Sequence, residues 1–273
     1  KDLDDLFEQV EFFVDSVSDY KSDFVLFPEY FNAPLMSKFN DMGEAQSIRG
    51  LAQYTEKIRD RFVELAISYN INIITGSMPY VKEDGGLYNV GFLCRRDGSV
   101  DMYEKIHVTP DEQKSWGLSK GNRVQTFDTD CGRIGVLICY DVEFPELSRL
   151  MAEDGMQILF VPFNTDTQNA YARVKVCAQA RAVENECYVA IAGSVGNLPR
   201  VHNMDIQYAQ SAVFTPCDFA FPTDGKRAMA TPGTEQILVA DCDLTLLNEL
   251  HTYGSVRNLR DRRSDLYELR MKK

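Results

Sequence analysis

The stretch RIGVLICYDVEFPE, residues 133–146, predicts a strand, a turn and the start of a helix in direct succession. Residues 133–139 are largely apolar and β-branched, as in a buried strand, and Pro145 suits the first turn of a helix. The Asp-Cys-Gly turn just upstream favours a hairpin between this strand and residues 124–129. Cys139 is therefore expected where a strand ends.

Strands and helices alternate on both sides of this stretch. Residues 87–95 and 99–108 flank an Asp-Gly turn, which is a strong hairpin signal. The other expected elements are strands at 24–27, 71–78, 157–163, 187–194, 212–215 and 236–241 and helices at 3–17, 51–69 and 171–186. This alternation is typical of a layered α/β protein, and we find no domain boundary within residues 1–273.

Composition excludes several classes of protein. The chain has 29 basic and 41 acidic residues, a net charge of -12, so it is not a nonspecific binder of nucleic acid. It has no apolar run near the roughly 20 residues of a membrane helix, so we expect a cytoplasmic protein without membrane contact. Its seven cysteines are odd in number and lack a C-x-x-C pair, which disfavours a disulfide framework or a structural zinc.

Three reactive side chains stand at or near the ends of strands: Glu29, Lys105 and Cys139. Groups beyond strand ends converge in α/β sheets, so these three are candidates for one pocket. Each also has a purely structural interpretation. A free cysteine on an apolar strand is usually a small buried hydrophobe, a glutamate after Phe-Pro is often a cap, and a hairpin lysine is usually solvated.

The sequence motifs around these residues resemble those of the nitrilase superfamily of carbon-nitrogen hydrolases. The matching segments are Phe27-Pro28-Glu29-Tyr30, Tyr103-Glu104-Lys105-Ile106-His107, Cys139-Tyr140-Asp141 with Phe144-Pro145-Glu146, residues 179–185 and residues 262–267. The resemblance implies a four-layer α-β-β-α sandwich. The family usually has a strand before its first helix, which this sequence lacks, so we expect a fragment of a longer chain.

The resemblance also implies roles. Cys139 is the expected nucleophile, Glu29 the general base and acid, and Lys105 the cation facing the oxyanion, with Glu112 as a second glutamate between lysine and cysteine and Asp111 as its alternative. A neighbouring ammonium and a proton-accepting carboxylate are what a thiol needs for activation at neutral pH. The cleavage of a small amide to acid and ammonia through a thioester would then need no metal and no cofactor.

Four residues are expected to bind substrate because they lie on loops around the expected pocket: Tyr30, Tyr140, Glu143 and Asn164. The backbone N–H of Tyr140 is also a candidate oxyanion donor. Arg173 could bind a substrate carboxylate, but pairing with a structural acid is the simpler expectation. The Cys-Tyr-Asp motif is more similar to the corresponding motif of amidase branches than to that of true nitrilases. The resemblance therefore favours amide over nitrile hydrolysis.

Other functions stay open at this point. A Cys-His hydrolase would need His107, which shares a strand face with Lys105. A non-catalytic binding or assembly module, an ammonia-supplying glutaminase domain and an acyl transferase are further alternatives on the same fold. We also expect a homodimer in which the basic segment 257–267 crosses to the other subunit. A similarity to the branch carrying an N-acetyltransferase domain predicts a fused domain before Lys1.

Overall fold

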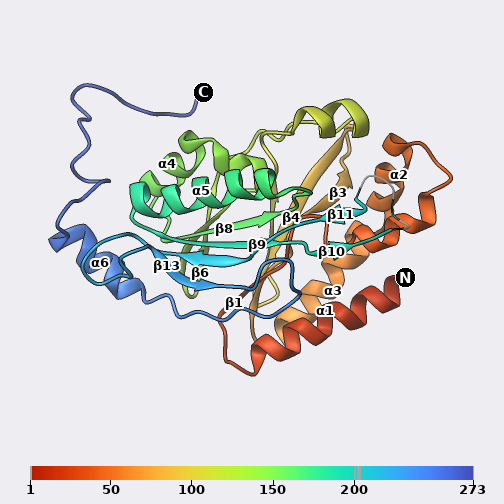
Figure 1. Cartoon of the computed structure of the whole chain (residues 1–273), viewed down its shortest axis with the longest axis horizontal. Helices are drawn as coiled ribbons and strands as arrows, with labels where there is room; N and C mark the ends of the chain where they lie inside the picture. Colours follow the sequence, from red (N-terminus) through yellow and green to blue (C-terminus); the bar gives the residue numbers. More distant parts are fainter. Residues whose placement is uncertain (1, 200, 202–203, 273) are drawn as a thin grey trace.

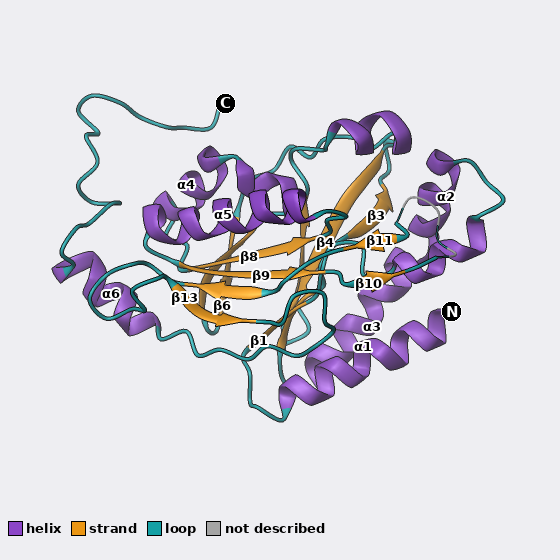
Figure 2. Cartoon of the chain, in the orientation of Figure 1, coloured by secondary structure: helices purple, strands orange, loops and turns teal. Residues whose placement is uncertain are grey.

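The computed structural model describes residues 2–199, 201 and 204–272, and its two larger β-sheets lie between two layers of helices (Figure 1). Helices α1 (Leu3–Ser18) and α3 (Thr55–Ser68) cover one sheet, and α4 (Pro145–Glu153) and α5 (Gln168–Asn185) cover the other. Figure 2 shows these helices on opposite sides of the strands. The expected α-β-β-α sandwich is confirmed.

The strands of the two larger sheets come from the two halves of the chain. The first sheet contains β1 (Phe24–Leu26), β2 (Asn72–Ile74), β3 (Met78–Val81), β4 (Leu87–Cys94) and β5 (Val100–Glu104). The second contains β6 (Thr126–Thr129), β7 (Gly132–Val136), β8 (Ile158–Phe163), β9 (Tyr188–Gly193), β12 (Ala212–Phe214) and β13 (Lys226–Met229). Outside them, β10 (Gly196–Asn197) and β11 (Ile206–Gln207) form a small antiparallel sheet of their own. The other elements are helices α2 (Glu44–Leu51) and α6 (Leu244–Tyr253), the short 3₁₀-helical turns η1 (Ala33–Phe39), η2 (Ala52–Tyr54) and η4 (Cys139–Glu143), and the π-helical turn η3 (Glu112–Trp116).

Strand pairing explains where the two sheets present their ends. In the first sheet β1 runs parallel to β2, and β4 pairs antiparallel with β2, β3 and β5, which confirms the hairpin around the Asp-Gly turn. In the second sheet β7, β8 and β9 are parallel neighbours, with β6 antiparallel to β7. Parallel strands end at one edge, so the loops after β7 and β8 lie next to each other.

The two sheets pack face to face through apolar side chains. Phe24 of β1 contacts Phe160 of β8 with ring centroids 5.3 Å apart, and Tyr103 of β5 contacts Phe127 of β6 at 6.5 Å. On the outer side of the first sheet, Val14 of α1 and Phe62 of α3 are buried in the same core. This packing fixes the ends of β1 and β5 against those of β7 and β8.

Two expected strands end early in the structure, the one at 99–108 at Glu104 and the one at 133–139 at Val136, and two others differ more. The single strand at 71–78 is divided into β2 and β3 because Gly76 has a φ of +69°, and a Cβ there would lie 2.0 Å from the carbonyl oxygen of Pro28. The strand expected at 236–241 is a loop. A strand needs a hydrogen-bonded neighbour, and within the described residues no strand pairs with this segment, which lines a cavity instead.

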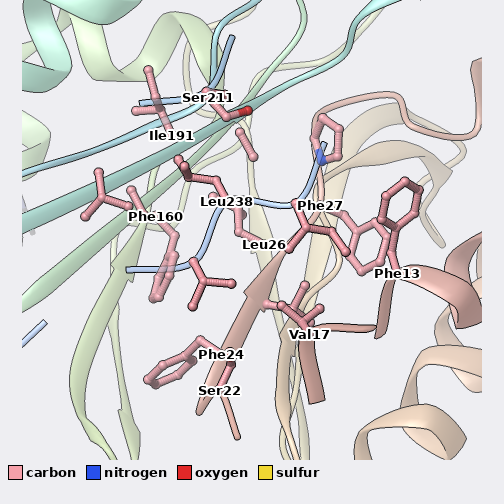
Figure 3. A pocket seen from close by; sticks show the side chains of 18 of the residues that line it. Phe13, Val17, Ser22, Phe24, Leu26, Phe27, Phe160, Ile191, Ser211 and Leu238 are labelled. Carbon is pink, nitrogen blue, oxygen red and sulfur yellow. The ribbon is translucent and has the colours of Figure 1, made fainter. Parts of the chain in front are cut away.

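That cavity, of about 1090 Å³, lies between α1, β1, β9 and the 236–241 loop (Figure 3). Its walls are mainly apolar and include Phe13, Val17, Phe24, Ile191 and Leu238. Glu29, Lys105, Glu112 and Cys139 are not among its lining residues. The cavity is thus not lined by these four side chains, although Pro28 and Tyr30, the neighbours of Glu29, are part of its wall.

All seven cysteines are free thiols in the structure. Within the described ranges, no helix is both long enough and apolar enough to span a membrane. The segment 257–272 follows α6 as a mostly exposed loop, and one of its arginines, Arg262, forms an ion pair with Glu153 of α4. The homodimer predicted through this segment stays a prediction.

Candidate active site

Glu29 is held by a turn that closes onto the first sheet. It follows β1 and makes a parallel bridge with Ser77, and the N–H of Tyr30 donates to the carbonyl of Ser77 at 2.7 Å. Tyr30 has a φ of +52°, a left-handed conformation that is uncommon outside glycine. This turn directs the Glu29 side chain, which is 1% exposed, into the interior between the sheets.

Lys105 directly follows β5, and its backbone is fixed on both sides. Its N–H donates to the carbonyl of Asn89 at 2.9 Å, and its carbonyl accepts from the N–H of Gly121 at 2.8 Å. The side chain is 1% exposed, so the ammonium group is almost completely removed from water. A buried ammonium is stable only with paired charges around it.

Cys139 opens the η4 turn, three residues after β7 ends, as predicted from the sequence. Its φ of +47° is left-handed, which turns the side chain away from the strand direction. The thiol lies 3.6 Å from the carbonyl oxygen of Asn164, the residue that follows β8. The nucleophile candidate therefore belongs to the second sheet, whereas Glu29 and Lys105 belong to the first.

These residues meet in one buried cluster. The Lys105 ammonium donates to Glu29 Oε1 at 2.8 Å and to Glu112 Oε1 at 2.7 Å. Glu29 Oε1 also accepts from the side-chain amide of Asn89 at 2.8 Å, while Glu29 Oε2 accepts the backbone N–H of Asn164 at 2.9 Å. The Cys139 thiol reaches the same place through Asn164: it lies 3.6 Å from the Asn164 carbonyl oxygen, and the N–H of Asn164 is the donor to Glu29 Oε2.

Glu112 is fixed as firmly as Glu29. Its Oε2 accepts the N–H of Thr109 at 2.8 Å, and its Oε1 accepts the hydroxyl of Tyr30 at 3.2 Å. The Tyr30 ring makes an edge contact with Trp116 at 5.4 Å. Glu112, the residue expected to be the second glutamate, thus lies beside Lys105. Its alternative, Asp111, is the residue just before the η3 turn.

Burial and charge perturb the pKa values in this cluster. Burial raises the pKa of Glu29, with Glu112 adding to the rise and Lys105 opposing it. Burial alone would lower the pKa of Lys105, but Glu112 and Glu29 outweigh it and hold that pKa well above its usual range. Burial and the Glu29 charge raise the pKa of Cys139, so the resting sulfur is a thiol rather than a thiolate.

The residues expected to bind substrate lie in different surroundings. Tyr30 is buried with its hydroxyl on Glu112, and Asn164 contacts Glu29 through its backbone. The side-chain amide nitrogen of Asn164 is buried and has no hydrogen-bond partner among the described residues. Tyr140 is partly exposed and its ring contacts Phe144. Glu143 forms an ion pair with Arg173 at 3.4 Å, the structural pairing that we expected for Arg173.

Two residues of the site were not singled out from the sequence. Asn89 interrupts the apolar run of β4, and a buried polar side chain within such a run is a detectable signal. Asp141 stands two residues after Cys139, and its carboxylate binds the segment after Lys105. His107, the base considered for a Cys-His hydrolase, pairs with Asp141 at 2.9 Å.

The carbon-nitrogen hydrolase family model matches residues 1–252. The chain belongs to this family. A curated relative of this carbon-nitrogen hydrolase is the probable hydrolase YhcX of Bacillus subtilis, 48% identical over 265 residues. That alignment covers 97% of the chain and 52% of the relative, so the chain spans about half of YhcX.

Two further comparisons concern amidases. Human omega-amidase NIT2 is 33% identical over 263 residues, covering 91% of this carbon-nitrogen hydrolase and 86% of NIT2. A solved amidase variant from Nesterenkonia sp. AN1 superposes with a TM-score of 0.72 at 21% identity, covering 95% of this chain and 88% of that one. It carries the acetamide moiety of fluoroacetamide on its active-site cysteine. At that identity the superposition establishes the shared fold.

Proposed function

We propose that this carbon-nitrogen hydrolase cleaves a small amide to a carboxylic acid and ammonia through a thioester on Cys139. The observation that carries the proposal is the buried cluster in which Glu29 binds the Lys105 ammonium and, through Asn164, is joined to the residue that contacts the Cys139 thiol. A base, a cation and a sulfur nucleophile gathered in one site are the groups that acyl transfer needs.

Proton transfer follows from the hydrogen bonds of Glu29. Its Oε1 accepts from both Lys105 and Asn89, whereas its Oε2 accepts the Asn164 N–H. Oε2 is therefore the oxygen with room for a proton, and it takes the thiol proton as sulfur attacks the amide carbonyl. The raised pKa of Glu29 helps the carboxyl to hold this proton.

Attack places negative charge on the carbonyl oxygen. Two of the three Lys105 N–H groups are used by Glu29 and Glu112, and the third is directed to this oxygen, with the Tyr140 N–H as a second donor. Loss of one such donor typically slows turnover by about 100-fold or more. As the C–N bond breaks, Glu29 returns the proton to nitrogen and ammonia leaves.

Hydrolysis of the thioester repeats these steps with water. Glu29 takes a proton from water as the oxygen attacks the acyl carbon, the C–S bond breaks, and Glu29 returns the proton to sulfur. The acid is released and the free thiol is restored. Neither stage requires an oxidant or a reductant.

The relatives support an amide as the substrate class. NIT2 is named an omega-amidase, and the Nesterenkonia amidase forms a covalent adduct at its cysteine. An acyl transferase would share the thioester but pass it to an amine, and a glutaminase domain would turn over glutamine almost exclusively. Both alternatives are distinguished by product analysis.

The first test measures iodoacetamide labelling of all seven cysteines at neutral pH, with peptide mass spectrometry as the readout. We expect Cys139 to react selectively, Glu29→Gln and Lys105→Ala to change its rate, and an amide substrate to protect it. Exposed Cys217 is the internal control, since neither variant should alter its labelling. Uniformly slow labelling of Cys139 that neither variant affects would support a non-catalytic module and contradict the proposal.

A panel of small amides then tests turnover, with ammonia and acid measured in equal amounts. Cys139→Ser is expected to abolish both products while keeping the fold. Turnover by this variant at the wild-type rate would refute the thioester.

A further inference from the structure

Asp141 is a fully buried carboxylate that the proposed chemistry does not use. Its Oδ2 accepts the N–H of Ile106 at 3.0 Å, and its Oδ1 accepts the N–H of His107 at 2.7 Å. The Asp141 side chain has no exposed surface. Since an unpaired buried carboxylate is costly, these donors are essential to keep it in place.

The His107 ring supplies a third contact. Its Nδ1 lies 2.9 Å from Asp141 Oδ1, and because a carboxylate accepts hydrogen bonds, Nδ1 carries the hydrogen. The ring stacks on Phe144, with centroids 3.6 Å apart and planes 7° from parallel. Phe144 ends the η4 turn that begins at Cys139, so the ring is fixed against the same turn.

These contacts connect the two sheets beside the reacting groups. Asp141 is two residues from Cys139 in the η4 turn, and its own N–H donates to the carbonyl of Ile138 at 3.0 Å. Ile106 is bonded to Lys105, which follows β5 of the first sheet. One carboxylate therefore joins the nucleophile turn to the backbone that carries the ammonium group.

We propose that Asp141, fixed by His107, is a positioning residue that sets the Lys105 ammonium against the Cys139 sulfur. The inference rests on the proposed amide hydrolysis for its turnover readout. A displacement of about 1 Å in a reacting group can cost about 100-fold in rate, so small changes in this link are measurable.

The test compares Asp141→Asn and His107→Gln in the full chain. Asp141→Asn places an amide NH2 group against the backbone N–H groups of Ile106 and His107. We expect kcat to fall about 100-fold while KM stays within about threefold of the wild-type value. His107→Gln removes one of three donors, and we expect kcat to fall about tenfold. His251→Gln is the matched control, because His251 is similarly exposed and bonds to the Glu186 carbonyl in another part of the fold.

A second readout does not depend on turnover: the pH profile of Cys139 alkylation. The ionisable groups that act on this thiol are Glu29, Lys105 and Glu112, and Lys105 is the one that favours the thiolate. When the ammonium group moves away, the thiolate loses stabilisation. Both variants should therefore shift the alkylation midpoint to higher pH, by about half a unit or more, whereas His251→Gln should not.

The outcomes separate the inference from the proposed function. Folded variants with wild-type kcat and an unchanged alkylation midpoint would overturn the positioning role. So would a loss of activity that matches only the loss of folded protein, with the midpoint unchanged. If the wild-type chain hydrolyses no amide, the proposed function fails, and the alkylation midpoint still decides whether Asp141 positions Lys105. If Asp141→Asn does not fold, His107→Gln provides the same two measurements.

Discussion

Replacing Lys105 with methionine should destabilise the protein in a pH-dependent way. Lys105→Met keeps most of the buried volume but leaves the carboxylates of Glu29 and Glu112 without their shared cation. Breaking a buried ion pair from one side typically costs about 3–5 kcal/mol. With roughly 2.1 cal/mol/K of unfolding entropy per residue, 273 residues give about 0.6 kcal/mol/K and a Tm loss of about 5–9 °C.

The sign of the pH dependence follows from Glu29. Its pKa is already raised by burial, and Lys105 is the group that opposes this rise, so the pKa of Glu29 should rise further in the variant. A folded state with a raised carboxyl pKa binds more protons than the unfolded chain, and its stability falls as pH rises through that pKa. The Tm difference between variant and wild type should therefore be smallest near pH 5 and largest near pH 8.

Thermal unfolding monitored by circular dichroism from pH 5 to pH 8 measures this difference. Lys226→Met is the matched control, because Lys226 pairs with Asp224 on the surface, and its Tm should stay within about 1 °C of wild type. A Tm difference for Lys105→Met that is constant across this range, or a variant more stable than wild type at pH 8, would refute the electrostatic reasoning.

Two further predictions concern packing and the support of Glu112. Gly91→Ala should lower the free energy of unfolding, measured in urea, by more than about 3 kcal/mol. The added Cβ would lie 2.1 Å from the Gly76 carbonyl oxygen and 2.4 Å from the Tyr103 ring. In the control Gly43→Ala, the added Cβ meets no described atom within 4 Å, and the free energy of unfolding should fall by only about 0.5 kcal/mol. Equal losses of unfolding free energy in the two variants would contradict the clash at Gly91. Tyr30→Phe should cost about 1–2 kcal/mol by the same assay, since its hydroxyl donates to Glu112, and an unchanged urea midpoint would argue against that bond.

Local sequence signals were sufficient where the structure depends on neighbours along the chain. The position of Cys139 after a strand, the hairpin around residues 95–99 and the helix start at Pro145 all follow from turn chemistry and apolar runs, and the structure confirms them. The motifs that resemble the family also pointed to Glu29 and Lys105, and these two side chains are hydrogen-bonded in the cluster.

The sequence was insufficient where a structural feature depends on distant partners. Residues 236–241 contain the apolar run Ile237 to Ala240, as a buried strand does, but strand formation depends on a hydrogen-bonded neighbour, and this segment lines the cavity. The partners of Asn89 and Asp141 depend on elements that are distant in the sequence: β4 brings Asn89 to Glu29, and η4 brings Asp141 to the segment after Lys105. For such residues, burial and hydrogen-bond partners supply the information that spacing lacks.

The division of the catalytic cluster between two sheets bears on how the protein folds. Glu29 and Lys105 are contributed by the first sheet and Cys139 by the second, so neither sheet alone can create the environment of the thiol. The sulfur should react like an unperturbed cysteine until the sheets dock. Time-resolved alkylation of Cys139 during refolding would therefore report the docking step itself, separately from the formation of helices and strands.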